Sequence, residues 1–227
     1  MSTVLSPSIH LFPTPKPAAT PKPAGVAPVA LREIRPDDAA ALQAFVRALS
    51  PVSRRLRFHM ALNELTESGL TALTRVDQRA HVAFVLTTAE RGVERIVGEA
   101  RYVVSCDKET AEFAIAVAEG FRGLGLAERL VAALLRAARA AGLRWLFGEV
   151  LADNARMLAF ARRCGFAETT RGGLEPGVVR VERCVDRPLA VAEADGSRTG
   201  AVHRVLSRLL AAYLPSSLES ACDFQQF

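Results

Sequence analysis

The strongest chemical signal in the sequence is a run of seven residues: Phe121, Arg122, Gly123, Leu124, Gly125, Leu126 and Ala127. This run, which we call the cradle, follows an alternating strand-like segment at 111–118 and precedes a helical pattern at 128–141. Its glycines allow the backbone to turn sharply and to approach an anion closely. The first N–H groups of a helix have no partner within it, and the helix dipole adds positive charge there. Arg122 contributes a full charge, so we predict that the cradle binds a pyrophosphate group.

A glycine-containing loop before a helix is weak evidence by itself. The dinucleotide fingerprint G-x-G-x-x-G would need a third glycine where Glu128 stands, and a P-loop would need a lysine, which the cradle lacks. The alternative interpretation is a glycine-rich helix cap that binds no ligand. Further motifs must therefore decide what the cradle binds.

A second chemical candidate is the carboxylate of Glu112, in the alternating segment just before the cradle. Strand alternation places it on one face with Ala114, Ala116 and Ala118, whose small side chains leave room for a substrate. A carboxylate in a cleft can accept a proton from a reacting group. We predict that Glu112 is a general base, and the alternative is an exposed glutamate at a strand edge.

Composition excludes several classes of protein. The chain has 227 residues, half of them hydrophobic, which is enough for one domain with tails. Its net charge of +5 is modest, so we expect no nucleic-acid partner. No apolar run approaches the length of a membrane span, and the N-terminus does not have the pattern of a secretory signal.

The cysteines and histidines do not form a metal-binding pattern. No two of the four cysteines have the spacing of zinc ligands, and the four histidines form no H-x-x-x-H pair. Reduced thiols in a cytoplasmic protein are the simplest interpretation. We therefore expect a cytoplasmic protein without a metal site. His81 begins a predicted strand, where a structural role is expected.

Three segments are predicted along the chain. Residues 1–28 hold seven of the twelve prolines and are expected to form an extended tail, or alternatively a docking peptide for a proline-reading domain. Residues 29–186 form the predicted domain. Residues 187–227 comprise a linker, an amphipathic helix at 199–214 and a tail. That helix would pack on the domain or on a second subunit, as in a homodimer, with a membrane surface as the alternative.

Hydrophobic periodicity and capping residues predict the elements of the domain. The expected helices run from a cap at Asp37 to Leu49, over 51–58, from a cap at Thr66 over 67–76, over 128–141, and from Asn154 to Gly165. The expected strands are 29–35, 80–88, 93–105, 111–118, 143–151, and a final hairpin of 166–170 with 178–186.

Two motifs and the element order resemble one protein family. The pattern Arg-x-x-Gly-x-Ala at 122–127 resembles the acetyl-CoA signature [Q/R]-x-x-G-x-[G/A] of the GNAT N-acetyltransferases. Residues 154–166 resemble the Asn-led helix of that family, which ends in Gly-Phe. The resemblance implies an α/β (α+β) GNAT fold, with a mixed, mostly antiparallel sheet of six to seven strands flanked by about four helices, and an extra C-terminal helix here.

The resemblance also implies roles for individual residues. Acetyl-CoA would be the co-substrate, backbone groups near Val117 would pair with its pantetheine arm, and Asn154 would be a further contact. Family members commonly use a glutamate as base five residues before that valine, where Glu112 stands. Many also carry a tyrosine that protonates the leaving thiolate, and the matching position here is Ala161.

Several segments resemble the catalytic domain of bacterial protein lysine acetyltransferases that modify acyl-CoA synthetases: 34–36, 49–58, 100–102, 111–114 and 148–151. This resemblance implies a protein lysine, in a partner such as an acyl-CoA synthetase, as the acceptor. The alternatives are a small amine as acceptor and a non-catalytic CoA-binding sensor. Arg54, Arg55 and Arg57 are expected on a solvated helix face, with contact to the CoA 3′-phosphate or to an acidic partner as the alternative.

Overall fold

The structure is a computed structural model and describes residues 28–90, 92–170 and 176–186. The predicted proline-rich tail, at 1–28, and the predicted C-terminal helix, at 199–214, lie outside the described residues apart from Pro28.

One seven-stranded sheet organises the described residues, with the strand order β1-β2-β3-β4-β5-β7-β6. Every neighbouring pair is antiparallel except β4 and β5, which are parallel. The strands are β1 (Val29–Glu33), β2 (His81–Glu90), β3 (Val93–Val104), β4 (Thr110–Val117), β5 (Trp145–Leu151), β6 (Ala167–Thr169) and β7 (Val178–Cys184). The predicted fold class, a mixed and mostly antiparallel sheet flanked by helices, is confirmed.

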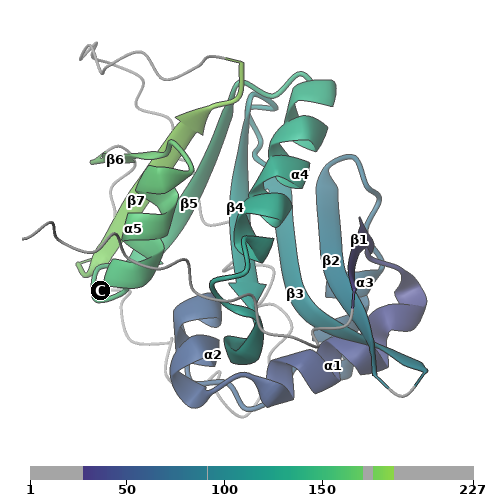
Figure 1. Cartoon of the computed structure of the whole chain (residues 1–227). Coiled ribbons are helices and arrows are strands. Elements are labelled where there is room, and N and C mark those ends of the chain that lie inside the picture. Colours follow the sequence, from purple (N-terminus) through teal and green to yellow (C-terminus); the bar gives the residue numbers. More distant parts are fainter. Residues whose placement is uncertain (1–27, 91, 171–175, 187–227) are drawn as a thin grey trace, which may run out of the picture.

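Helices cover the sheet and build two hydrophobic clusters. The described α-helices are α1 (Ala39–Ala48), α2 (Pro51–Phe58), α3 (Glu67–Thr74), α4 (Leu126–Ala140) and α5 (Ala155–Arg163). One cluster joins α4 and α5 to the sheet, and the other contains side chains of α1 and α3. In Figure 1, α4 and α5 lie in front of the sheet, whereas α1 and α2 lie along its lower end.

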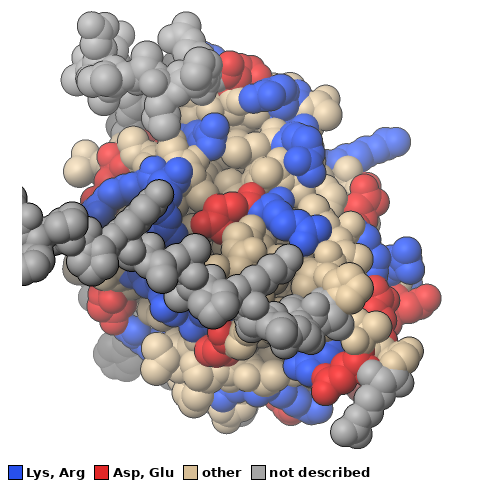
Figure 2. All heavy atoms as spheres, viewed as in Figure 1, with Lys and Arg blue, Asp and Glu red and all other residues tan. Residues whose placement is uncertain are grey.

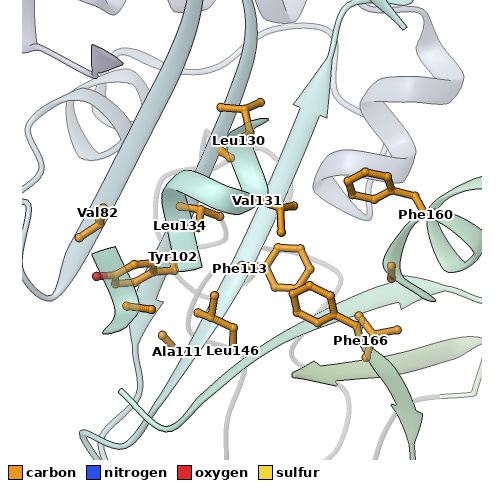
Figure 3. Close-up of a cluster of buried hydrophobic side chains, with 14 of the residues drawn as sticks. Val82, Tyr102, Ala111, Phe113, Leu130, Val131, Leu134, Leu146, Phe160 and Phe166 are labelled. Atoms are coloured by element: carbon orange, nitrogen blue, oxygen red, sulfur yellow. The ribbon is translucent and has the colours of Figure 1, made fainter. Parts of the chain in front are cut away.

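The cluster under α4 follows from the apolar stripe of that helix. Leu130 and Leu134 are one helical turn apart, Val131 lies beside Leu130, and all three are buried against the sheet (Figure 3). Phe113 of β4 packs there with its ring centroid 4.8 Å from that of Phe166. A Cβ atom at Gly148 would lie 2.8 Å from the Phe113 ring, so glycine is required where β5 passes this side chain.

The parallel pair β4 and β5 separates along its length. Register pairs join the two strands only at Thr110, Ala111 and Glu112 of β4, opposite 145–147 of β5. Beyond that point β4 continues to Val117 and β5 to Leu151 without pairing with each other. Figure 1 shows β4 and β5 diverging toward the lower end of the sheet. An opening between two central strands leaves backbone groups of both strands unpaired across it.

One predicted cap is wrong. Asp37 does not begin the first helix: Pro36–Asp38 forms a 3₁₀ turn, η1, and α1 starts at Ala39 with Asp38 as its N-cap residue. The Asp38 carboxylate accepts a 2.7 Å hydrogen bond from the backbone N–H of Arg35 and pairs with Arg32 of β1 at 2.7 Å. The partly buried ion pair with Arg32 of β1 favours Asp38 as the N-cap. Sequence spacing alone could not distinguish the neighbouring residues Asp37 and Asp38.

Candidate active site

A cavity of about 750 Å³ occupies the opening between β4 and β5. Its volume is in the range usual for small-molecule sites, about 300–1,000 Å³. The walls come from α2, β4, the cradle, β5 and α5. Among the residues selected from the sequence, the lining contains Glu112, Val117, Arg122, Gly123, Gly125, Leu126, Ala127 and Asn154. Leu124 is not part of the lining, and its side chain is among the exposed large hydrophobic ones.

The cradle presents bare backbone to this cavity. Gly123 and Gly125 have φ values of 78° and 72°, a left-handed conformation that favours glycine. A Cβ atom at either position would meet no atom within 4 Å, so the space beside them is open. Gly125 is the N-cap residue of α4 and provides no side-chain cap, which leaves the first N–H groups of α4 available to an anion.

Arg122 is held against neighbouring elements. Its Nε donates to the backbone oxygen of Val117 at 3.2 Å, and its Nη2 donates to Ser53 Oγ of α2 at 2.9 Å. The same guanidinium lies 3.4 Å from the Glu119 carboxylate. The side chain therefore connects the cradle to the end of β4 and to α2, contacts that the local motif did not indicate.

Glu119 completes this connection. Its carboxylate accepts hydrogen bonds from Ser53 Oγ at 2.5 Å and from the Ser50 N–H at 3.2 Å. Burial by itself would raise the pKa of Glu119, but the hydrogen bonds from Ser53 and Ser50 lower this pKa to about 2. A permanently charged carboxylate thus fastens the N-terminal turn of α2 beside the cradle.

Glu112 lies inside the cavity at the point where β4 and β5 stop pairing. It is only 4% exposed, which contradicts the alternative of an exposed glutamate at a strand edge. Ala114 and Ala116, on the same face of β4, also line the cavity. The predicted small-residue face is therefore part of the cavity wall, next to a buried carboxylate.

Three buried charged residues anchor α2 to the sheet. Arg57 of α2 donates two hydrogen bonds to Glu99 Oε1 of β3, at 2.8 and 2.5 Å, and Arg101 donates to Glu99 Oε2 at 2.9 Å. The side chains of Arg57 and Glu99 are each only 4% exposed. Burial by itself would raise the pKa of Glu99, but the charges of Arg101 and Arg57 hold it below its usual range. We call Arg57, Glu99, Arg101 and His81 the buried network.

The predicted solvated face of α2 is therefore wrong at Arg57, because this side chain is buried with Glu99. Arg54 is also turned inward, and its Nη1 donates to the backbone oxygens of Arg47 and Leu49 at 3.1 and 2.7 Å. Arg55 is exposed, as predicted, and pairs with Asp153 at 2.9 Å. Arg55 and Arg57 pair with residues far away in the sequence, and Arg54 binds backbone carbonyls. The residue types of α2 alone therefore could not predict these partners.

His81 joins the buried network from β2. Its Nε2 lies 3.1 Å from Arg101 Nη1, which also donates to the backbone oxygen of Leu73 at 3.0 Å. Burial, together with the charge of Arg101, lowers the pKa of His81 to about 4. The imidazole is therefore neutral near pH 7. His81 is not among the residues that line the cavity, in agreement with the expected structural role.

One face of α5 forms the remaining wall. Asn154 caps this helix, with its side-chain oxygen accepting from the Met157 N–H at 3.1 Å, and it lines the cavity. Ala161 instead points into the core and is 1% exposed. Four further residues of α5 line the cavity and were not singled out from the sequence: Arg156, Met157, Phe160 and Arg163. Positions 156, 160 and 163 have helical spacing, and this periodicity could have indicated from the sequence that they share one helix face.

The described residues contain no group of three or more His, Cys, Asp or Glu side chains placed to hold a metal ion. Cys106, Cys164 and Cys184 are free thiols. Within 28–90, 92–170 and 176–186, no helix has both the length and the apolar character needed to cross a membrane.

Comparisons with known proteins agree on the family. A model of the Acetyltransferase (GNAT) family matches residues 54–166. Acetyltransferase PA5475 of Pseudomonas aeruginosa is 32% identical over 138 residues, which cover 61% of this chain and 74% of that protein.

Solved structures show the same fold. The GNAT domain of S. lividans PAT is 26% identical, with a TM-score of 0.62 over 68% of this chain and 89% of that chain. The yncA protein of Salmonella typhimurium, solved with its cofactor acetyl-CoA, has a TM-score of 0.55 at 20% identity, and the match covers 74% of this chain and 100% of that chain. With the sheet, the family match and the identity to PA5475 in agreement, the chain belongs to the GNAT family of acetyltransferases.

Proposed function

We propose that this protein transfers the acetyl group of acetyl-CoA to a lysine side chain of another protein, with Glu112 as the general base. Acetyl-CoA is the co-substrate of the family, whereas the lysine acceptor and the base are our proposal. One observation carries it: the cradle and the Glu112 carboxylate line the same cavity. A group held at the cradle and a proton acceptor can therefore act on one reaction.

The cofactor half of the cavity suits a long anionic ligand. The N–H groups at the start of α4 and the open space at Gly123 and Gly125 would receive the pyrophosphate. The β4 strand pairs with β5 only as far as Glu112. Beyond that point, backbone groups of β4 near Val117 would hold the pantetheine arm, with Asn154 as a further contact. Acetyl-CoA supplies an activated acetyl thioester when it is bound there.

Glu112 would take the proton that the attacking amine must lose. A free lysine amine has a pKa near 10.4, so it is mostly protonated at neutral pH and needs a base. The carboxylate is buried in the cavity, and the adjacent Ala114 and Ala116 leave room for a lysine side chain. Because Ala161 is in the core and carries no hydroxyl group, protonation of the leaving thiolate is assigned to water.

The lining favours a protein acceptor over a polycationic small amine. Three glutamates and four arginines line the cavity, which is not the acidic pocket that such an amine would require. Val52 of α2 is 64% exposed and lines the cavity, which provides an apolar contact for a protein surface. The sequence segments that resemble bacterial protein lysine acetyltransferases favour an acyl-CoA synthetase as the acceptor protein. We assign this activity to residues 29–186, the predicted domain.

The test is to incubate the protein with acetyl-labelled acetyl-CoA and a cell lysate, and then to identify labelled lysines by mass spectrometry. The Glu112→Gln protein is the matched control, and its labelling should be strongly reduced. Label found only in small molecules would replace the protein acceptor by a small amine. Binding of acetyl-CoA without any transferred label would instead indicate a CoA-binding sensor.

A further inference from the structure

We propose that the cavity-facing side of α5 binds the 3′-phosphate of acetyl-CoA, through Arg163 with Arg156 on the same helix face. This inference rests on the proposed use of acetyl-CoA as co-substrate. It adds the residues that recognise the third phosphate of that molecule.

The chemistry of the cofactor requires a second anion site. Acetyl-CoA carries a pyrophosphate and, separately, a phosphate monoester on its ribose. The cradle offers one cluster of backbone N–H groups, which matches the pyrophosphate. A phosphate monoester carries a charge of about −1.5 to −2 at pH 7, and arginine recognises such a group by paired, charge-assisted hydrogen bonds. The second site should therefore be an arginine near the cradle.

Two of the four arginines that line the cavity are already engaged. Arg57 is buried and donates two hydrogen bonds to Glu99, so its release would leave that carboxylate buried without this partner. Arg122 donates to the Val117 carbonyl and to Ser53 Oγ. These contacts tie both guanidinium groups to the protein scaffold.

The other two arginines are on α5 and are exposed. Arg156 and Arg163 are seven residues apart, about two helical turns, and both line the cavity. Arg163 lies 5.8 Å over the ring of Phe160, which supports its guanidinium from below. Figure 2 shows basic side chains over α5, with acidic ones beside them.

Arg163 is also next to the cradle. Its Nη2 lies 4.0 Å from Oε1 of Glu128, which belongs to the first turn of α4 and follows Gly125 by three residues. Both side chains are more than half exposed. An ion pair this long and this exposed contributes little, so a phosphate can replace Glu128 as the partner of Arg163.

The experiment compares calorimetric binding of acetyl-CoA and of 3′-dephospho-acetyl-CoA. We expect the wild-type protein to bind the dephosphorylated compound about tenfold more weakly, as is typical for the loss of one charge-assisted hydrogen-bonded contact. Arg163→Gln should bind acetyl-CoA several-fold more weakly than wild type and should lose most of the discrimination between the two compounds. Arg156→Gln should lose part of the discrimination, and the double variant should lose all of it.

Arg162→Gln is the matched control. Arg162 is on the same helix and is similarly exposed, but it pairs with Glu168 at 2.5 Å and does not line the cavity. This variant should keep the full preference for the 3′-phosphate. Because Arg163 is exposed, its variants should have the melting temperature of the wild type, which shows that they are folded.

Three results would overturn the proposal. Equal binding of both compounds by the wild type would show that the 3′-phosphate is not recognised, while the proposed use of acetyl-CoA would stand. Wild-type discrimination in the double variant would place the phosphate elsewhere. If the wild type bound neither compound, the proposed function would itself fail.

Discussion

The cradle and the buried network are two charged regions that are built in different ways, and both reach the cavity, the network through Arg57 alone. The cradle is mostly exposed and consists of backbone in left-handed glycine conformations at the start of α4. The buried network consists of side chains from α2, β2 and β3, and Arg57 and Glu99 have almost no exposure. The first region is the proposed ligand site, whereas the second holds protein elements together.

Glu112 is on the β4 face that also adjoins the buried network. In the register of β3 and β4, Ala114 pairs with Arg101 and Ala116 pairs with Glu99. Cross-strand partners point to the same face of a sheet, so the buried network adjoins the face that carries Glu112. The comparison indicates that ligand affinity, chemistry and stability can be altered separately, because different residues are responsible for each.

The largest expected effect concerns the chemistry alone. Glu112→Gln keeps the shape of the side chain and removes the proton acceptor. We expect kcat to fall by about 10² to 10⁴, the usual contribution of general-base catalysis, with acetyl-CoA affinity within a few-fold of wild type. Acetylation assays at pH 7 and calorimetry measure the two quantities. A nearly wild-type kcat in this variant would show that Glu112 is not the general base.

Breaking the buried network should affect stability. Glu99→Ala leaves two buried guanidinium groups without their common carboxylate, which typically costs about 3–5 kcal/mol. The free energy of unfolding in urea measures this loss. Glu64→Ala is the matched control, because the pair of Glu64 with Arg47 is exposed and such pairs contribute about 0–1 kcal/mol. Similar losses of unfolding free energy in both variants would show that the buried network stabilises the fold no more than an exposed ion pair does.

Filling the cradle should affect affinity and leave the fold in place. In Gly125→Glu the added carboxylate enters open space and repels the pyrophosphate, so we expect acetyl-CoA affinity to fall by more than about a hundredfold. Gly125→Ala carries the same backbone strain without the charge and should bind much more tightly than Gly125→Glu. Unchanged calorimetric affinity in folded Gly125→Glu would contradict the assignment of the cradle.

A smaller effect should appear as a pH dependence of stability. The pKa of His81 is about 4 in the folded protein and near 6.5 when unfolded, so the unfolded chain binds more protons between these values. The contribution of His81 is present above pH 6.5 and is lost as pH falls toward 4, by roughly 3 kcal/mol at most. Urea unfolding of wild type and His81→Asn from pH 7 to 5 tests this. Equal slopes against pH would exclude His81 as the cause.

Much of this protein was determined by local sequence. Each predicted helix and strand between 29 and 186 appears, with end residues shifted by a few positions at most. The predicted cap at Thr66 and the predicted helix start at Asn154 agree with the structure, because helix starts depend on neighbouring residues. The cradle was recognisable for the same reason, since its conformation depends on two glycines and the adjacent helix.

Only the tertiary structure decided which charged side chains face the cavity. Arg57 meets Glu99 across 42 residues, and Arg122 meets Ser53 across 69. Alternation predicted the face of Glu112 but could not show that α2 and β5 enclose it, nor that β4 and β5 separate beyond it. Periodicity gives the direction of a side chain relative to its own element. Its partner is set by the packing of elements that are distant in the sequence, because burial forces each charge to find an opposite charge or a backbone carbonyl.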